Sequence, residues 1–228
     1  IISCAIAIIE AGATPVLVDC ESETWTMDAE QVKKKITART KAIMAVHIYG
    51  HSVDMDPLLS LAKEHNLYVI EDAAEAHGAE YKGRKCGSLS DISILSFYAN
   101  KLITTGEGGM VLTNNQEFAA KARLLRNMYF IPEKRFYHTD IGHNYRMTNL
   151  QAAVGVAQMK QIDEFVERKR RMARLYNELL CDLPIQLPNE KQWAKNVYWM
   201  YGIVLNNEVS LDTYQCMQKL LEKGIETR

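Results

Sequence analysis

Strand-like and helix-like segments alternate over the first part of the chain. Short apolar runs that suit buried strands are separated by longer amphipathic stretches, and Asp28 stands where a helix N-cap is expected. Such alternation is typical of an α/β fold, in which helices flank a mainly parallel central sheet. We therefore expect helices at about 2–11, 28–36, 56–65 and 116–127, and strands at 15–19, 42–47, 67–70, 92–97 and 109–113.

The remainder of the chain has a different pattern. One long helix is predicted from about 148 to 181, although its apolar positions follow helical spacing imperfectly. Pro184 and Pro188 mark a junction, after which we expect a strand near 198–205 and a helix near 211–223. The pattern predicts three parts: a large domain at 1–150, a connecting helix at 151–182, and part of a smaller C-terminal α+β domain at 183–228.

The composition argues against several classes of protein. The 228 residues are 47% hydrophobic and 24% charged, and the formal net charge of −1 gives no support for a nucleic-acid or anionic-membrane partner. The five cysteines are odd in number and contain no C-x-x-C pair. We interpret them as free thiols in a reducing cytoplasm, and expect neither disulfides nor a metal site. No apolar run approaches the ~20 residues that a membrane span needs.

One lysine lies in a turn between two strand-like runs. Lys101 follows the run at 92–97 and precedes the run at 109–113, in a segment rich in glycine and threonine. A partly desolvated amine can form a Schiff base with a carbonyl, and pyridoxal phosphate carries such a carbonyl. The alternative for Lys101 alone is a solvated turn lysine, which is common.

An acidic motif precedes this lysine in the sequence. Asp72 comes just after the predicted strand at 67–70, at the sheet edge where ligands bind in parallel α/β folds. Most residues from 73 to 79 are small, which leaves room for a flat ring. A pyridine cofactor needs an acid at its ring nitrogen, because the protonated ring is the better electron sink. Asp72 and Lys101 would be the two poles of such a site, although Asp72 alone could simply cap a loop.

Three segments around these residues resemble signature blocks of one family. They are VIEDAAEAHGA at 69–79, SFYANKLITTGEGGMV at 96–111 and GHNYRMTNLQAA at 142–153. In this order they resemble the DegT-type nucleotide-sugar aminotransferases, which are pyridoxal-phosphate (PLP) enzymes of fold type I, the fold of aspartate aminotransferase. Within the family, the sequence is most similar to the perosamine-synthase branch, which aminates a 4-keto-6-deoxy sugar nucleotide.

The resemblance implies a role for five residues. Lys101 would hold pyridoxal 5'-phosphate covalently and then move the proton as general base and acid. Asp72 would meet the pyridine nitrogen, Glu75 would lie near the 3′-oxygen, and Ser96 would help to hold the phosphate. Asn144 would reach the phosphate of the neighbouring subunit's cofactor, which would make a homodimer with shared active sites obligatory.

Three further residues are weaker candidates for substrate binding. His47 and His77 could line the substrate pocket, or could be structural histidines whose hydrogen bonds are satisfied within the protein. Arg228 could meet the substrate, or could be a mobile residue at the end of the chain. We interpret Trp199 and its aromatic neighbours as core of the smaller domain.

The resemblance implies an aminotransferase that moves an amino group from glutamate to a keto-deoxysugar nucleotide, in sugar or polysaccharide biosynthesis. A PLP-dependent sugar dehydratase is disfavoured, because those relatives have histidine at the position of Lys101. A noncatalytic or regulatory protein on the same fold stays open as an alternative.

Both ends look truncated relative to the family, and the phosphate-binding turn expected ahead of Ile1 is not in this sequence. No G-x-G-x-x-G follows the first predicted strand, which disfavours a Rossmann module.

Overall fold

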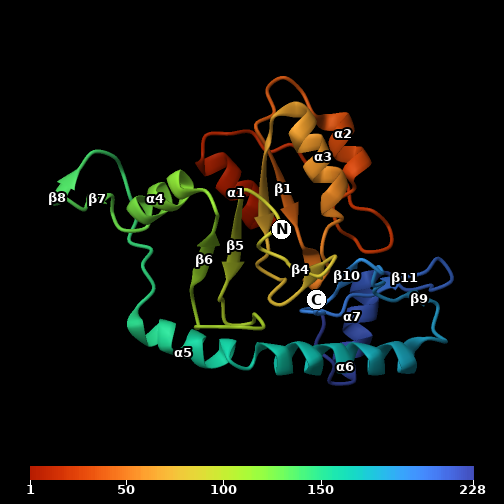
Figure 1. Cartoon of the computed structure of the whole chain (residues 1–228). Helices are drawn as coiled ribbons and strands as arrows, with labels where there is room; N and C mark the ends of the chain where they lie inside the picture. The colour runs from red at the N-terminus through yellow and green to blue at the C-terminus, as the bar shows by residue number, and fades with distance from the viewer.

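The computed structural model describes residues 1–228, with the exception of the side chain of Arg135. Its centre is a four-stranded sheet in the order β1-β2-β5-β6. Strands β1, β2 and β5 are parallel, and β6 is antiparallel to β5 (Figure 1). The predicted α/β class with a mainly parallel sheet is therefore confirmed. The four strands are Ala42–Val46, Tyr68–Asp72, Ile92–Ser96 and Gly109–Leu112.

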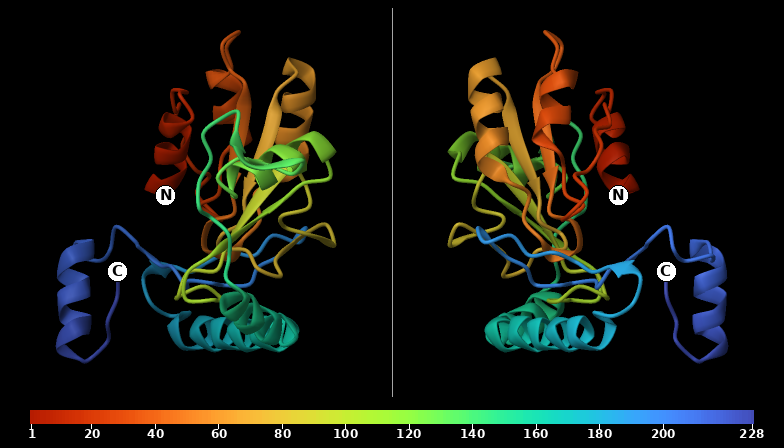
Figure 2. Two further views of the ribbon diagram at one scale, coloured as in Figure 1. Left: turned by 90° about the vertical axis from the view of Figure 1, so that its left-hand side faces the viewer. Right: turned by 90° about the vertical axis from the view of Figure 1, so that its right-hand side faces the viewer.

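Three helices accompany the parallel strands, close to their predicted bounds. Helix α3 packs on β1, β2 and α2, whereas α1 lies across the strands from α3 (Figure 2). Asp28 caps α2 as predicted, because its side chain accepts a hydrogen bond from the N–H of Glu30. Asn66 ends α3 in the left-handed conformation. The helices are α1 (Ile2–Glu10), α2 (Ala29–Lys35) and α3 (Met55–His65).

The hydrophobic core lies between α3 and the sheet. Met55 and Leu58 of α3 are fully buried against residues at alternate positions of the strands, among them Ile43, Ala45 and Val69. Alternation is expected because successive side chains of a strand point to opposite faces of the sheet. Burial of each large apolar side chain contributes about 1.5–3 kcal/mol, so this layer fixes the position of the strand ends.

The predicted long helix from about 148 to 181 is wrong, because the chain forms two helices in its place. Helix α5 (Asn149–Met159) begins with a capping box between Thr148 and Gln151, and α6 (Ile162–Leu180) follows it along one edge of the molecule (Figure 1). Gln161 separates them with a non-helical φ of −112° and ψ of 8°. The apolar spacing is imperfect over 148–181 because the two helices have different surroundings: α6 has buried residues and α5 has none.

Smaller elements complete the fold. Strand β10 pairs with β3, which pairs with β4, and β11 pairs with β9. The predicted helices at 116–127 and 211–223 are confirmed as α4 and α7. The elements are β3 (Glu80–Tyr81), β4 (Arg84–Lys85), α4 (Gln116–Leu125), β7 (Phe130–Ile131), β8 (Lys134–His138), β9 (Ile185–Gln186), β10 (Ala194–Lys195), β11 (Val204–Leu205) and α7 (Thr213–Glu222).

Two predicted strands are wrong in whole or in part. The segment at 15–19 is not a strand: Val16 and Leu17 are exposed, and only an isolated bridge between Cys20 and Met27 follows it. Its apolar pattern suits a strand, but no strand of the described residues lies beside it to share hydrogen bonds. The strand predicted near 198–205 is confined to β11, and residues 198–203 form no strand. Among the described residues, no helix is long and apolar enough to cross a membrane.

Candidate active site

The carboxyl ends of the three parallel strands meet at one edge of the sheet. Val46 of β1 lies opposite Asp72 of β2, and Asp72 lies opposite Ile94 of β5. Asp72 is buried and is the last residue of β2, so the strand extends slightly beyond its predicted end. Open parallel sheets bind their ligands at this edge, because the loops that follow the strands form a crevice there.

Both carboxylate oxygens of Asp72 are held by hydrogen bonds. Oδ1 accepts from the N–H of Ala74 at 3.0 Å, and Oδ2 accepts from the thiol of Cys4 at 2.9 Å. Cys4 lies on α1, so this contact ties α1 to the end of β2. Each carboxylate oxygen can accept a second hydrogen bond. Asp72 is therefore oriented and still able to meet a further donor.

We expect the thiol of Cys4 to resist alkylation. Burial, together with the hydrogen bond to Asp72 and its negative charge, raises the pKa of Cys4 to about 12. Because only the thiolate reacts, at about pH 8.5 iodoacetamide should modify Cys4 at least ~100-fold more slowly than an ordinary thiol. The exposed Cys20 and Cys181 are the internal standards, and mass spectrometry of the peptides gives the three rates. In Asp72→Asn, alkylation of Cys4 should be faster than in the wild type. Equal alkylation rates at the three thiols of the wild type would contradict the hydrogen bond between Cys4 and Asp72.

Lys101 lies in the loop between β5 and β6, and backbone hydrogen bonds close this loop. The N–H of Phe97 donates to the carbonyl of Gly108 at 2.8 Å, and the N–H of Thr105 donates to the carbonyl of Phe97 at 3.0 Å. Ile103 is fully buried and anchors the loop. Gly108 has a φ of 149°, and a Cβ there would lie 2.7 Å from Oγ1 of Thr105, so the close turn requires glycine.

Helix α5 holds the same loop from outside the sheet. Oε1 of Gln158 accepts from the N–H of Thr104 at 2.9 Å, and Nε2 of Gln151 donates to the carbonyl of Glu107 at 3.0 Å. These side-chain bonds attach the loop to a helix at two points. The backbone around Lys101 is therefore fixed by long-range contacts that its local sequence does not contain.

The amine of Lys101 lies near Glu75 and within the electrostatic influence of Asp72. Its side chain is only 11% exposed, and Nζ lies 3.9 Å from Oε1 of Glu75. Burial lowers the pKa of Lys101 below its ordinary value, against the opposing effect of Glu75 and Asp72. Within the described residues, Nζ makes no hydrogen bond. The three residues therefore share one site, and the amine loses its proton more readily than a solvated lysine would.

Glu75 is fixed by the backbone of Tyr49. Oε2 of Glu75 accepts from the N–H of Tyr49 at 2.7 Å. Tyr49 lies in the short 3₁₀ turn η1 (Ile48–Gly50) with a φ of 55°, a left-handed conformation that costs about 1–3 kcal/mol for a bulky residue. Burial raises the pKa of Glu75, although the Tyr49 N–H and Lys101 oppose this. The carboxyl group is therefore positioned to hold or share a proton within the site.

His47 lies in the interior and has no ring nitrogen left for a substrate. It is fully buried, Nδ1 accepts from the N–H of Val53 at 3.0 Å, and Nε2 lies 2.9 Å from Oε1 of Glu71. Of the two alternatives drawn from the sequence, this geometry supports a structural histidine. The sequence interpretation did not consider Glu71, which is the partner that holds this ring.

His77 is buried behind the loop of Lys101. It is 3% exposed, and its ring packs against that of Phe97 at a centroid distance of 5.7 Å. Neither ring nitrogen has a hydrogen-bond partner among the described residues. Burial, followed by the positive charge of Lys101, lowers the pKa of His77 to about 4. The ring is therefore neutral at neutral pH and adds no charge to the site.

The other predicted site residues lie further apart. Ser96 ends β5 at the same sheet edge, partly exposed, and its hydroxyl accepts from the N–H of Tyr98 at 3.3 Å. Asn144 is exposed in the segment that joins β8 to α5, which runs on the β6 side of the sheet (Figure 1). Arg228 is exposed beyond α7. No described contact joins Asn144 or Arg228 to the amine of Lys101.

The sequence interpretation missed the role of Trp199. Its ring lies over Nζ of Lys101, with 3.7 Å between the nitrogen and the ring centroid. Its Nε1 donates to the carbonyl of Asn100 at 2.8 Å. Strand β10, just before Trp199 in the chain, pairs with β3 and so brings this segment to the site. No local pattern in the sequence signals a contact between residues so far apart in the chain.

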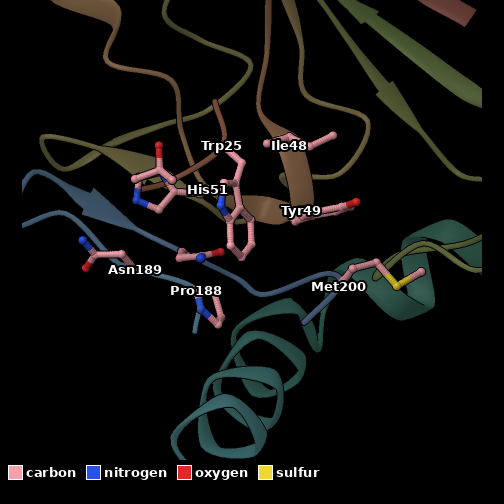
Figure 3. Close-up of a pocket in the computed structure, with 9 residues that line it drawn as sticks. Trp25, Ile48, Tyr49, His51, Pro188, Asn189 and Met200 are labelled. Carbon is pink, nitrogen blue, oxygen red and sulfur yellow. The ribbon is translucent and has the colours of Figure 1, made fainter. Parts of the chain in front are cut away.

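A pocket is lined by Tyr49 of η1, together with Trp25, Pro188 and Met200 (Figure 3). Its walls come from the segments at 24–25, 48–51 and 188–200, and Tyr49 belongs both to the pocket wall and to the hydrogen bond that holds Glu75. Trp25 and Tyr49 both have left-handed φ angles, of 61° and 55°, and their rings meet edge to face at 6.3 Å. Tyr49 is therefore a strained residue that joins this pocket to Glu75, and Trp25 packs against its ring.

The whole chain, residues 1–228, matches the model of the DegT/DnrJ/EryC1/StrS aminotransferase family. The chain is 46% identical to a GDP-perosamine synthase of Caulobacter vibrioides, over 100% of this chain and 62% of that protein. It is 44% identical to a GDP-perosamine synthase of Escherichia coli O157:H7, over 97% of this chain and 60% of that protein. The chain thus spans less than two thirds of the length of these relatives.

Solved structures agree with the sequence relatives. DesV of S. venezuelae superposes with a TM-score of 0.91 at 35% identity, over 99% of this chain and 60% of that one. DesI, solved in the presence of its TDP-sugar product, superposes with a TM-score of 0.91 at 31% identity, over 100% of this chain and 58% of that one. The similarity extends through the strand ends and loops that carry Asp72, Glu75 and Lys101, and the chain belongs to the DegT/DnrJ/EryC1/StrS aminotransferase family.

Proposed function

We propose that this chain carries the lysine-bearing part of a PLP-dependent aminotransferase, which moves an amino group from glutamate to a keto-deoxysugar nucleotide. The observation that carries the proposal is the desolvated amine of Lys101, 3.9 Å from Glu75 and within the electrostatic influence of Asp72. A buried amine that releases its proton readily is the group that attacks a carbonyl. Its place at the carboxyl edge of a parallel sheet is where such a fold binds ligands.

The residues of the site fit pyridoxal 5'-phosphate by their chemistry. The cofactor has an aldehyde, a ring nitrogen, a phenolic oxygen and a phosphate. The chain offers an amine at Lys101, an oriented carboxylate at Asp72, a buried carboxyl at Glu75 and a hydroxyl at Ser96. Residues 73, 74 and 76 are alanines; Ala73 and Ala76 are buried in the core, and Ala74 is partly exposed next to Asp72.

Each of these residues would have a separate task. When bound, PLP would supply an electron-accepting ring that stabilises negative charge on the reacting carbon. Asp72 would hold the ring nitrogen, and its own orientation is fixed by Cys4 and Ala74. Lys101 would hold the aldehyde carbon through Nζ and would later carry the proton on the same atom. Glu75 would share a proton with the phenolic oxygen, and Ser96 would donate to the phosphate.

A nucleotide-linked deoxysugar is the substrate class that the relatives favour. Two of them are named GDP-perosamine synthase, and a Micromonospora megalomicea relative, 39% identical over 87% of this chain, is named a dTDP-3-amino-3,4,6-trideoxy-alpha-D-glucose transaminase. The higher identity to the perosamine synthases supports a 4-keto-6-deoxy sugar. His77 and Arg228 remain proposals as substrate contacts, and a place in polysaccharide biosynthesis is likewise part of the proposal.

A homodimer is part of the same proposal. None of the residues of α5 is buried, and large apolar side chains are exposed on α5 and on the segment that leads to it, among them Ile141, Tyr145, Leu150 and Val156. Apolar surface of this kind marks an interface. A second copy on this side would cover this apolar surface and would bring Asn144 near the neighbouring site, as the family resemblance implies.

All five cysteines are free, which supports a reducing compartment such as the cytoplasm.

Amine transfer from labelled glutamate tests the function. The protein is incubated with PLP, ¹⁵N-glutamate and a panel of keto sugar nucleotides, and the products are separated by mass. We expect one nucleotide sugar to exchange its keto oxygen for a ¹⁵N-amino group, with an equal amount of 2-oxoglutarate. After borohydride reduction, the peptide that contains Lys101 should carry the mass of the cofactor. Cofactor on Lys101 without transfer to any sugar would favour the noncatalytic alternative, and no cofactor on Lys101 would overturn the assignment.

A further inference from the structure

The amine of Lys101 lies between two walls of different chemistry. One wall is the carboxylate of Glu75, whose Oε1 is 3.9 Å from Nζ, beyond hydrogen-bonding distance. The other wall is the face of Trp199, whose centroid is 3.7 Å from Nζ. A cation at this distance from an indole face is attracted by the negative face of the ring, most strongly where water is excluded.

We propose that Trp199 is a positioning residue for Lys101: when no cofactor is attached, its indole face holds the charged amine in the site, beside Glu75. The inference rests on the proposed function, in which the amine of Lys101 must be free before the cofactor attaches and again during each turnover. A lysine side chain has four rotatable bonds, so an amine without a hydrogen bond needs another contact to keep one orientation.

Trp199 is itself held firmly enough to act in this way. Its Nε1 donates to the carbonyl of Asn100, the residue that precedes Lys101. The N–H of Val197 donates to the carbonyl of Gly50, where a Cβ would lie 2.7 Å from the side chain of Val197 and 3.0 Å from the backbone nitrogen of Trp199. The close approach of these two backbone segments requires glycine at 50, so the indole is fixed from both its ring nitrogen and its backbone.

The groups that face Lys101 determine what loss of the indole would do. Glu75 and Asp72 favour the charged amine, and His77 on the loop behind it is neutral. Burial by the surrounding residues disfavours the charge. The indole both excludes water and attracts the ammonium group, and these two effects act on the protonation of Lys101 in opposite directions. Leucine is smaller than tryptophan, so it keeps only part of the first effect and removes the second, whereas phenylalanine keeps both in weaker form.

The test measures the protonation of Lys101 in the protein without added cofactor. Acetylation by acetic anhydride is followed as a function of pH, and mass spectrometry reads the rate at the peptide that contains Lys101. Because only the neutral amine reacts, the midpoint of the pH profile reports its protonation, independently of how accessible the amine is. In Trp199→Leu we expect the midpoint to fall, so that at a fixed pH below both midpoints the neutral fraction of Lys101 is roughly tenfold higher than in the wild type. The midpoint of Trp199→Phe should lie between those of the wild type and Trp199→Leu.

Two matched variants complete the experiment. Trp193→Leu makes the same substitution at a tryptophan that contacts His51 and Tyr81 and has no described contact with Lys101, so its midpoint should equal that of the wild type. Glu75→Gln removes a charge that favours the ammonium group, so its midpoint should also fall. Leucine and phenylalanine differ less in bulk than leucine and tryptophan do, so a midpoint in Trp199→Leu that is not lower than that in Trp199→Phe would overturn the inference. The amine-transfer assay is separate, so that result would leave the proposed aminotransferase untouched.

Discussion

Lys101→Ala should abolish amine transfer, by at least about 10³-fold, because the variant loses both the covalent attachment point and the proton carrier. The protein should remain folded. The substitution removes a cation that is 11% exposed and makes no hydrogen bond among the described residues. Its thermal midpoint should therefore equal or exceed that of the wild type, since a partly desolvated charge is lost along with few favourable contacts. The ¹⁵N-transfer assay measures the first effect, and calorimetry measures the second.

Two control variants separate the role of Lys101 from its charge. Lys101→Arg keeps a cation next to Trp199 and Glu75 but has no amine that can form an imine, so it should be as inactive as Lys101→Ala. Lys82→Ala removes an exposed lysine whose partner is Asp56 on the surface, and it should transfer amine at the wild-type rate. Wild-type transfer by Lys101→Ala would show that another group does the chemistry. An inactive Lys82→Ala would show that the assay responds to something other than the site.

The fold could be predicted from the sequence where local patterns and tertiary packing agree. The strands β1, β2 and β5 contain apolar residues that are buried at alternate positions, and the helices α2 and α3 have N-terminal aspartates and buried apolar residues on one face. The prediction failed where a segment depends on a distant partner. Residues 15–19 have the apolar pattern of a strand but no neighbouring strand, and the break at Gln161 follows from the different surroundings of α5 and α6.

The site could be predicted only as far as its residues are close in sequence or belong to a recognised motif. Asp72, Glu75 and Lys101 were expected together; Nζ of Lys101 lies 3.9 Å from Glu75, and the charge of Asp72 raises the pKa of the same amine. Cys4 and Trp199 were not expected there. Their contacts with Asp72 and Lys101 join opposite ends of the chain through the fold, and neither residue type at its position carries a local signal of chemistry.

Glu71→Ala should lower the free energy of unfolding by about 3–5 kcal/mol, the largest stability change we expect from one substitution. Glu71 is fully buried at the end of β2 and accepts four hydrogen bonds. The donors are Nε2 of His47 at 2.9 Å, the N–H groups of Gly87 at 2.6 Å and Leu89 at 2.8 Å, and the hydroxyl of Ser90 at 3.0 Å. Alanine would leave all of them buried without this acceptor. Urea unfolding at neutral pH measures the loss.

The comparison is Glu64→Ala, which removes an exposed glutamate of α3 and should change stability by less than ~0.5 kcal/mol. If Glu71→Ala stays within about 1 kcal/mol of the wild type, the carboxylate does not anchor the loop at 87–90. A small loss would also remove the reason to regard His47 as structural, because its ring would then not depend on this partner.

The charge of Glu71 can be separated from its shape by pH. Burial opposes its ionisation, but the hydrogen bonds from His47, Gly87 and Leu89 outweigh burial and hold the pKa of Glu71 below its ordinary value of 4.5. A carboxyl with a depressed pKa in the folded state stabilises the protein above its ordinary pKa, and this contribution is lost as the pH falls through the folded value. Glu71→Gln lacks this ionisation. Its deficit relative to the wild type should therefore be largest near pH 7 and shrink below pH 4.5, as urea unfolding at several pH values would show. Glu71 directly precedes Asp72, so protonation of Glu71 should also destabilise the end of β2. We therefore expect the fraction of Lys101 labelled by the cofactor to decrease over the same range of acid pH.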